Sequence, residues 1–153
     1  MKKIWSILLL TCLCCCGFVG CGGKEQDVTK LPHNVELSLS DTKDVIIEED
    51  GAVIASDGES LGTYKKEENV TLANKEYSVG YEFETNGEIQ WVAYTAKEAT
   101  LEEAREYVDS IYGDLETSEN GEYIIKCDGK TWTARCLESA SPIIFIVRDT
   151  TLD

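Results

Sequence analysis

The chain has 153 residues and little of several residue types on which common functional sites depend. It holds one histidine, and 14 lysine and arginine side chains stand against 29 aspartates and glutamates, which gives a formal net charge of −15. Proteins that bind the phosphate backbone of nucleic acids draw their affinity from lysine and arginine, so this balance argues against that class. With 42% hydrophobic residues, the chain is too apolar to be wholly disordered, and its length suits one domain with a real core.

Motifs for the familiar hydrolase and nucleotide chemistries are also missing. The sequence contains no G-x-S-x-G, no glycine-rich phosphate loop and no H-E-x-x-H. A catalytic base must be held within hydrogen-bond reach of its nucleophile. The one histidine, His33, follows Pro32 in a polar segment that we expect to be a solvent-exposed tether. We therefore expect that the protein is not an enzyme.

Cysteine is plentiful only at the start of the chain, where five of the seven cysteines fall within residues 1–21. Lys2 and Lys3 precede an apolar stretch, residues 4–20, that carries no charge. A basic start, a short apolar run and small residues together are typical of a signal peptide. The segment Phe18-Val19-Gly20-Cys21 resembles the lipobox of bacterial lipoproteins, although Phe18 stands where that family usually has leucine.

This resemblance implies that residues 1–20 are a signal peptide and that the Cys21 sulfur carries a diacylglyceryl group. The protein would then lie on the extracytoplasmic side of the cell membrane, held there by its lipid anchor. Loss of Lys2 and Lys3 leaves 12 basic and 29 acidic side chains, a net charge of −17. Two alternatives stay open: a secretory signal without lipid, and an uncleaved transmembrane anchor, since a span needs about 17–25 residues.

Cys127 and Cys136 are the remaining two cysteines, and the local pattern separates them. Asp128-Gly129 between two alternating runs predicts a two-residue hairpin that pairs Cys127 with Lys130. Cys136 then lies six residues along its strand from Lys130, about 20 Å away at about 3.3 Å per residue. A disulfide needs Cα atoms within about 7 Å. We favour two free core thiols, with a disulfide as the alternative. The same register pairs two further sets of residues, Ile125 with Trp132 and Tyr123 with Ala134.

The remainder of the chain predicts an α+β fold, an antiparallel β-sheet built of hairpins with one main α-helix packed on it. We expect a flexible tether over residues 21–34 and a single domain over residues 35–150. The helix is predicted over residues 101–112, because Thr100 and Glu103 form a capping box and Gly113 follows as a stop. Residues 57–76 have the weakest pattern. Strands are expected near residues 35–39, 44–48, 53–55, 77–84, 89–95, 122–127, 130–136 and 143–147.

The hairpin of residues 77–96 turns at Asn86-Gly87 and fits two registers. With a two-residue loop, Trp91 and Ile89 lie with Glu82 and Glu84 on the sheet face opposite the main core. With a three-residue loop, Trp91 and Ile89 join the aromatic core instead, which is the simpler interpretation. In the first register these four residues form a candidate binding face, since an exposed apolar patch often marks a partner site.

The sequence thus predicts a membrane-tethered extracytoplasmic lipoprotein whose small acidic domain binds a partner of the cell envelope without catalysis. That partner would be a protein or a component of the cell wall. No cofactor is expected, although acidic pairs near glycine turns, such as Glu48-Glu49-Asp50 and Asp57-x-Glu59, suit a calcium ion. The alternative function is a carboxylate-based enzyme or a calcium-dependent module on the cell surface.

Overall fold

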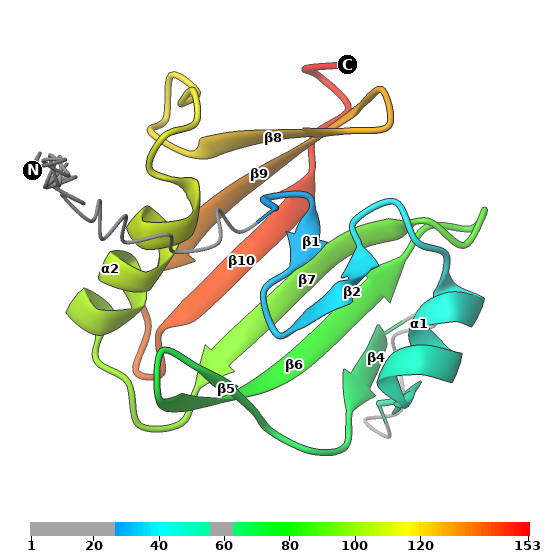
Figure 1. The fold of residues 1–153 in the computed structure, drawn as a ribbon, viewed down its shortest axis with the longest axis horizontal. Helices are drawn as coiled ribbons and strands as arrows, with labels where there is room; N and C mark the ends of the chain where they lie inside the picture. The colour runs from blue at the N-terminus through cyan, green and yellow to red at the C-terminus, as the bar shows by residue number, and fades with distance from the viewer. Residues whose placement is uncertain (1–26, 56–62) are drawn as a thin grey trace, which may run out of the picture.

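An antiparallel β-sheet organises residues 27–55 and 63–153, the part of the chain that the computed structural model describes (Figure 1). Its strands run in the order β3-β4-β6-β7-β10-β9-β8, and β5 pairs with β6 beside this path. The sheet strands are β3 (Ala52–Ile54), β4 (Thr63–Lys66), β5 (Val70–Leu72), β6 (Lys75–Phe83), β7 (Ile89–Ala96), β8 (Tyr123–Cys127), β9 (Lys130–Leu137) and β10 (Ile143–Arg148). The last strand in sequence, β10, lies between β7 and β9 and so joins the two hairpins into one sheet.

One side of this sheet, which we name the covered face, carries the other elements. These are a two-stranded ribbon of β1 (Lys30–Leu31) and β2 (Asn34–Ser38), the helix α1 (Lys43–Asp50) and the helix α2 (Leu101–Tyr112). All of them lie on the same side of the strands (Figure 1). The core is built between them and the strands, because alternate residues of β6 and β7 point to this side and are buried. The opposite side is named the open face.

The predicted α+β architecture is confirmed in its main elements, although the sheet dominates. Helix α2 has the predicted bounds, and both arms of the Thr100–Glu103 capping box are present. The turn at Asp128-Gly129 has φ angles of 50° and 75°, as a two-residue hairpin of this type requires. The pairs Cys127 with Lys130, Ile125 with Trp132 and Tyr123 with Ala134 are those of the structure. Cys127 and Cys136 are free.

The strand predicted over residues 44–48 is wrong, because this segment forms helix α1. Ile46 and Asp50, four positions apart, are both buried, whereas Ile47 between them is 37% exposed. This spacing is that of one helix face and not of alternating strand positions. Gly51 ends the helix in the left-handed conformation, with φ of 67°, which glycine adopts at little cost.

The predicted tether, residues 21–34, extends too far, because Lys30 and Leu31 within it already belong to the fold. Lys30 and Leu31 form strand β1, and the Leu31 side chain is fully buried in the core. Residues 21–26 lie outside the described part of the chain. A leucine, a proline and a histidine in a polar stretch gave no periodic pattern, so only the packing of the folded chain shows that this stretch belongs to the domain.

The hairpin of β6 and β7 combines features of both predicted registers. Glu82 pairs with Trp91, but Phe83 pairs with Ile89, so Gln90 is an extra residue in a β-bulge. A bulge reverses the alternation of side chains. Trp91 therefore lies on the open face, whereas Ile89 turns into the core and is fully buried. The expectation that Ile89 shares a face with Trp91 is wrong for this reason.

The capping box offers a direct test of the local folding of α2. We expect Thr100→Ala to lower the free energy of unfolding by about 1 kcal/mol, because the Glu103 N–H loses its acceptor. Urea unfolding of the variant and the parent measures this difference. Glu106→Ala, an exposed position in the middle of the same helix, is the matched control and should change stability by less than about 0.5 kcal/mol. Equal losses in both variants would contradict the capping role.

Candidate functional site

Four side chains from distant parts of the chain meet under the β1–β2 ribbon, and we name them the buried polar cluster: His33, Asp50, Tyr81 and Tyr94. The His33 and Asp50 side chains are each 2% exposed. His33 Nε2 lies 3.0 Å from both Asp50 carboxylate oxygens, and its Nδ1 lies 2.9 Å from the Tyr94 hydroxyl. The Tyr81 hydroxyl donates to Asp50 Oδ2 at 2.5 Å. The expectation of a solvent-exposed His33 is therefore wrong.

The Asp50 carboxylate is the electrostatic centre of this cluster. Burial by itself would raise its pKa, but hydrogen bonds from His33 and Tyr81 and the positive charges facing it outweigh burial and lower the pKa to about 2. Lys66 supplies one of those charges, with Nζ 3.2 Å from Oδ1 and 2.5 Å from the Asp50 carbonyl oxygen. Burial, followed by the Asp50 charge, raises the pKa of Tyr81 above its usual range. Near neutral pH the site thus pairs an ionised Asp50 with a protonated Tyr81.

A histidine beside an aspartate is the pair from which many enzymes build a general base, but here the geometry serves another purpose. Both ring nitrogens of His33 already have protein partners, and the ring is enclosed. A base has to reach a proton on its substrate or nucleophile. The cluster instead connects the β1–β2 turn, the last residue of α1 and strands β6 and β7, and Lys66 links it to β4. We conclude that it is a structural clamp.

The open face carries a shallow groove of about 580 Å³ over strands β4, β6 and β7. Its most prominent side chain is Trp91, which is half-buried. The ring lies across Gly80, where an added Cβ would be 3.5 Å from Trp91 Cζ3. Its Nε1 donates to the Glu82 carboxylate, and its other neighbour is the Phe145 ring, with centroids 5.8 Å apart. The outer edge of the indole ring thus reaches the Gly80 position at ordinary contact distance.

The predicted binding face is only partly assembled. Trp91 and Glu82 are cross-strand partners and touch. Ile89 is in the core on the other side of the sheet. Glu84 follows the end of β6, and its backbone joins the turn through a hydrogen bond to Glu88. The lipidation residue, Cys21, lies outside the described residues.

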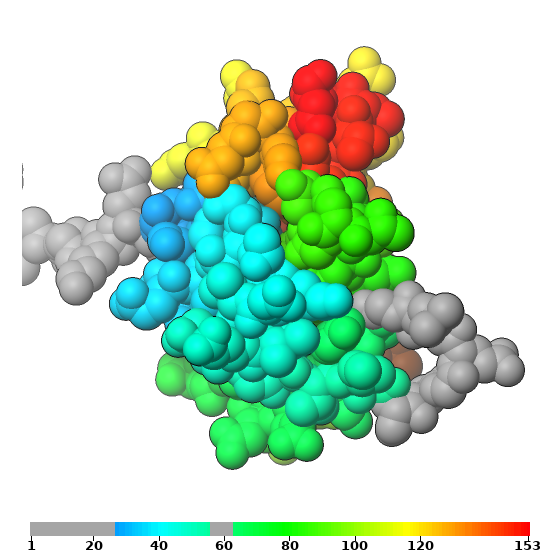
Figure 2. Space-filling model, turned by 90° about the vertical axis from the view of Figure 1, so that its right-hand side faces the viewer, coloured from blue at the N-terminus to red at the C-terminus, as the bar shows by residue number. Residues whose placement is uncertain are grey.

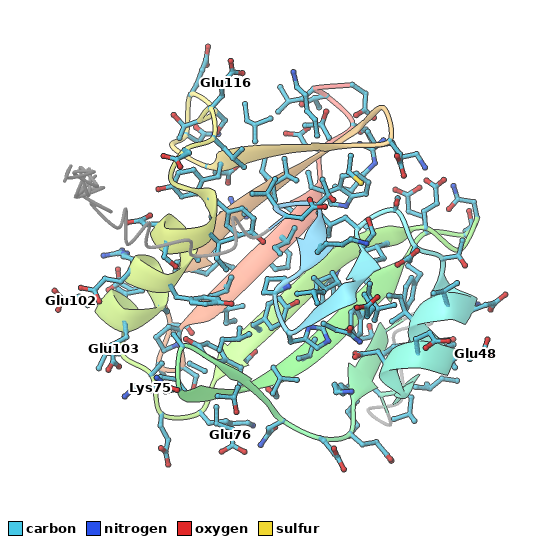
Figure 3. All side chains as sticks on the ribbon, in the orientation of Figure 1. Glu48, Lys75, Glu76, Glu102, Glu103 and Glu116 are labelled. Carbon is cyan, nitrogen blue, oxygen red and sulfur yellow. The ribbon has the colours of Figure 1, made fainter. Side chains whose placement is uncertain are left out.

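The carboxylates considered for calcium do not converge on one point. The Glu48 side chain projects from the outer edge of the molecule (Figure 3), and Glu48 and Glu49 are exposed whereas Asp50 is buried. Within residues 27–55 and 63–153 no three histidine, cysteine or acidic side chains are grouped to hold a metal ion. Asp50 is committed to the buried polar cluster, and Asp57 and Glu59 lie outside the described residues. The expectation of no cofactor stays a prediction, with calcium as its alternative.

A second hollow lies between α2 and the ends of β8 and β9, and Cys136 is part of its lining. Burial is the main cause that raises the pKa of the Cys136 thiol, and the charge of Asp109 adds to it against the opposing effect of Arg105. A raised pKa keeps the sulfur protonated, and the thiol is a weak nucleophile in that form. Asp109 itself accepts a hydrogen bond from the Tyr123 hydroxyl at 2.6 Å. The Cys136 thiol of this hollow is therefore not an activated nucleophile.

Comparisons with known proteins leave the function to be argued from the site itself. No protein-family model matches the chain, and no significant match was found among curated proteins or solved structures. Among the described residues, neither helix has the length and apolar character to cross a membrane.

The clamp predicts a specific pH dependence of stability. Because folding lowers the pKa of Asp50, its contribution is fully present above about pH 4 and is lost as the pH falls toward 2. We expect Asp50→Asn to lower the free energy of unfolding at pH 7 by about 2 to 3 kcal/mol. This deficit should shrink to a small part of its value near pH 2, where about half of the folded parent molecules have Asp50 protonated.

Urea unfolding of parent and variant at pH 7, 4 and 2.5 measures this effect. The control is Glu48→Gln, which removes an exposed carboxylate from the same helix and should leave the stability profile unchanged. A deficit of Asp50→Asn that stays constant across this range would show that the charge of Asp50 does not matter.

Proposed function

We propose that this protein is a lipid-anchored binding protein on the extracytoplasmic side of the cell membrane, and that the open face of its sheet receives the ligand. The observation that carries the proposal is the position of Trp91. The tyrosines and phenylalanine of β6 and Tyr94 of β7 point into the core, whereas Trp91 is turned to the open face over a groove. Sites for ligands are typically concave and lined by aromatic side chains with a few polar groups.

The anchor is supported by the resemblance of residues 18–21 to a lipobox and by the chain length that follows. Asp27, the first described residue, comes six positions after Cys21. Six residues span at most about 20 Å. A lipid on Cys21 would therefore hold the domain close to the membrane surface, and the acidic domain would be repelled by anionic lipid headgroups.

The attachment point also favours the open face as the ligand surface. The ribbon that begins the described fold lies on the covered face (Figure 2, blue, left). A membrane anchor that continues from the start of this ribbon would face the covered side of the sheet. The open face would then point away from the membrane and stay accessible to the envelope.

A binding function without catalysis is supported by the burial and protonation of the groups that could act as base or nucleophile. The His33–Asp50 pair is enclosed and fully engaged, and the Cys136 thiol is kept protonated. The groove on the open face offers an indole, lysines, hydroxyls and small residues. These groups recognise a ligand through stacking and hydrogen bonds, which require no activated nucleophile.

The anchor is tested through Cys21. Cells that express the full chain and receive labelled palmitate should yield a labelled protein in the membrane fraction. Cys21→Ser should abolish the label, because the serine hydroxyl does not replace the thioether. Cys16→Ser, which alters a cysteine of the same apolar run, should keep it. An unlabelled parent, or equal labelling of parent and Cys21→Ser, would contradict the anchor.

The ligand surface is tested with the full chain in lipid nanodiscs and labelled cell-envelope fragments. We expect Trp91→Ala to reduce the retained material at least tenfold, which corresponds to about 1.4 kcal/mol. The control is Val35→Ala, because Val35 is 60% exposed on β2, away from the open face. Thermal unfolding confirms that both variants fold. Retention that depends on Val35 and not on Trp91 would move the ligand surface to the covered side.

A further inference from the structure

The groove on the open face has a floor of small residues that crosses the strands. The registers place Lys65 opposite Gly80, Gly80 opposite Ala93, and Ala93 opposite Phe145. Neighbouring strands lie about 4.8 Å apart, so this row runs over about 14 Å from β4 to β10. Between its two ends, Gly80 and Ala93 leave the backbone surface low. The row is therefore a trough across the sheet, with Lys65 at one end and the Phe145 ring at the other.

The two sides of this trough differ in chemistry. On one side the Trp91 ring, whose outer edge reaches Gly80, forms an aromatic wall. On the other side Ser78 and Thr95 are cross-strand partners and place two hydroxyl groups next to each other. Among the described residues, neither hydroxyl forms a hydrogen bond with another protein group. A ligand in the trough would thus meet an apolar ring on one side and free donors and acceptors on the other.

The charges around the trough balance each other, although the protein as a whole is strongly acidic. Lys65, Lys97 and Glu67 line the groove, and Glu82 accepts the hydrogen bond from Trp91. A fourth lining group of interest, Lys66, is paired with Asp50. Neither sign prevails locally, whereas the chain carries −15. An anionic ligand would be repelled by the field of the protein, and Lys65 and Lys97, which Glu67 and Glu82 offset, would compensate for little of that repulsion.

From this arrangement we infer that the trough binds a neutral polysaccharide, with a pyranose ring stacked on Trp91. A pyranose has an apolar C–H face and a rim of hydroxyl groups that both donate and accept hydrogen bonds. Trp91 matches the apolar face, and Ser78, Thr95 and Lys65 match the rim. This inference rests on the proposed function, since it names the class of ligand that the open face receives.

The shape of the surface argues against a peptide strand in the same place. An extended peptide joins a sheet at its edge, where backbone N–H and C=O groups are unpaired. The trough crosses β4, β6 and β7, each of which has neighbours on both sides. Its backbone groups are thus committed to the sheet, and recognition has to come from the side chains. Stacking and hydroxyl contacts are the means by which side chains recognise a sugar.

The inference is tested by calorimetric titration of the full chain in nanodiscs with three hexasaccharides. Two are neutral, the β-1,4-linked hexamers of N-acetylglucosamine and of glucose, and one is the carboxylated hexamer of hyaluronan. We expect at least one neutral hexamer to bind saturably and at least tenfold more tightly than the hyaluronan hexamer. Trp91→Ala should weaken this binding at least tenfold, and Ser78→Ala combined with Thr95→Val should weaken it about threefold.

Gly80 provides a matched pair of variants. Gly80→Ala adds a Cβ at ordinary contact distance from the indole and should retain binding, whereas Gly80→Leu fills the floor and should abolish it. Tighter binding of the hyaluronan hexamer, or neutral binding that survives both Trp91→Ala and Gly80→Leu, would overturn the inference. If none of the three sugars binds while envelope fragments are still retained through Trp91, the sugar inference fails and the proposed binding function stands. If retention does not depend on Trp91 either, both fail.

Discussion

The buried carboxylate of Asp50 is the constraint on which the arrangement of this molecule depends. An ionised group without partners in a core is far too costly, so every folded state that buries Asp50 has to bring hydrogen-bond donors to it. His33, Tyr81 and Lys66 are those donors, and they come from the β1–β2 turn, β6 and β4. Compensating one charge thus fixes the ribbon and α1 on the same face of the sheet. The clamp thus holds the ribbon and α1 over the covered face, and the open face carries neither of them.

The sequence analysis succeeded where local chemistry decides the structure. Helix α2 has its own capping box, and the hairpin at Asp128-Gly129 has its own turn residues, so both could be predicted with their bounds or register. It failed where distant contacts decide. Val45-Ile46-Ile47 has strand propensity, but the need to bury Ile46 together with Asp50 makes the segment helical. Tertiary packing overrides propensity in such cases.

The candidate sites show the same division. One of the two registers that the sequence allowed places Trp91 and Glu82 on the same face, and in the structure they are cross-strand partners and touch. The bulge at Gln90 could not be read from the pattern, since apolar residues occupy both faces of β7, and for that reason Ile89 was misplaced. His33 was taken for an exposed residue because its partners, Asp50 and Tyr94, are 17 and 61 residues away in sequence. A pattern limited to neighbours contains no signal of such partners.

The few basic side chains of the described residues divide between ion pairs and the trough. In such an acidic chain, a site for anionic ligands would need several of the few basic side chains. Most of those in the described residues instead form ion pairs, among them Lys66 with Asp50, Lys75 with Glu103 and Arg135 with Glu122. The trough keeps two lysines, and Glu67 and Glu82 offset them. For the proposed ligand, long-range attraction would therefore contribute little, and affinity would have to come from contact: stacking on Trp91 and hydrogen bonds to Ser78 and Thr95. Such a surface would gain from repetition along a polymer, and the proposed lipid anchor, which would hold the domain close to the membrane, would keep it beside the same polymer after each dissociation.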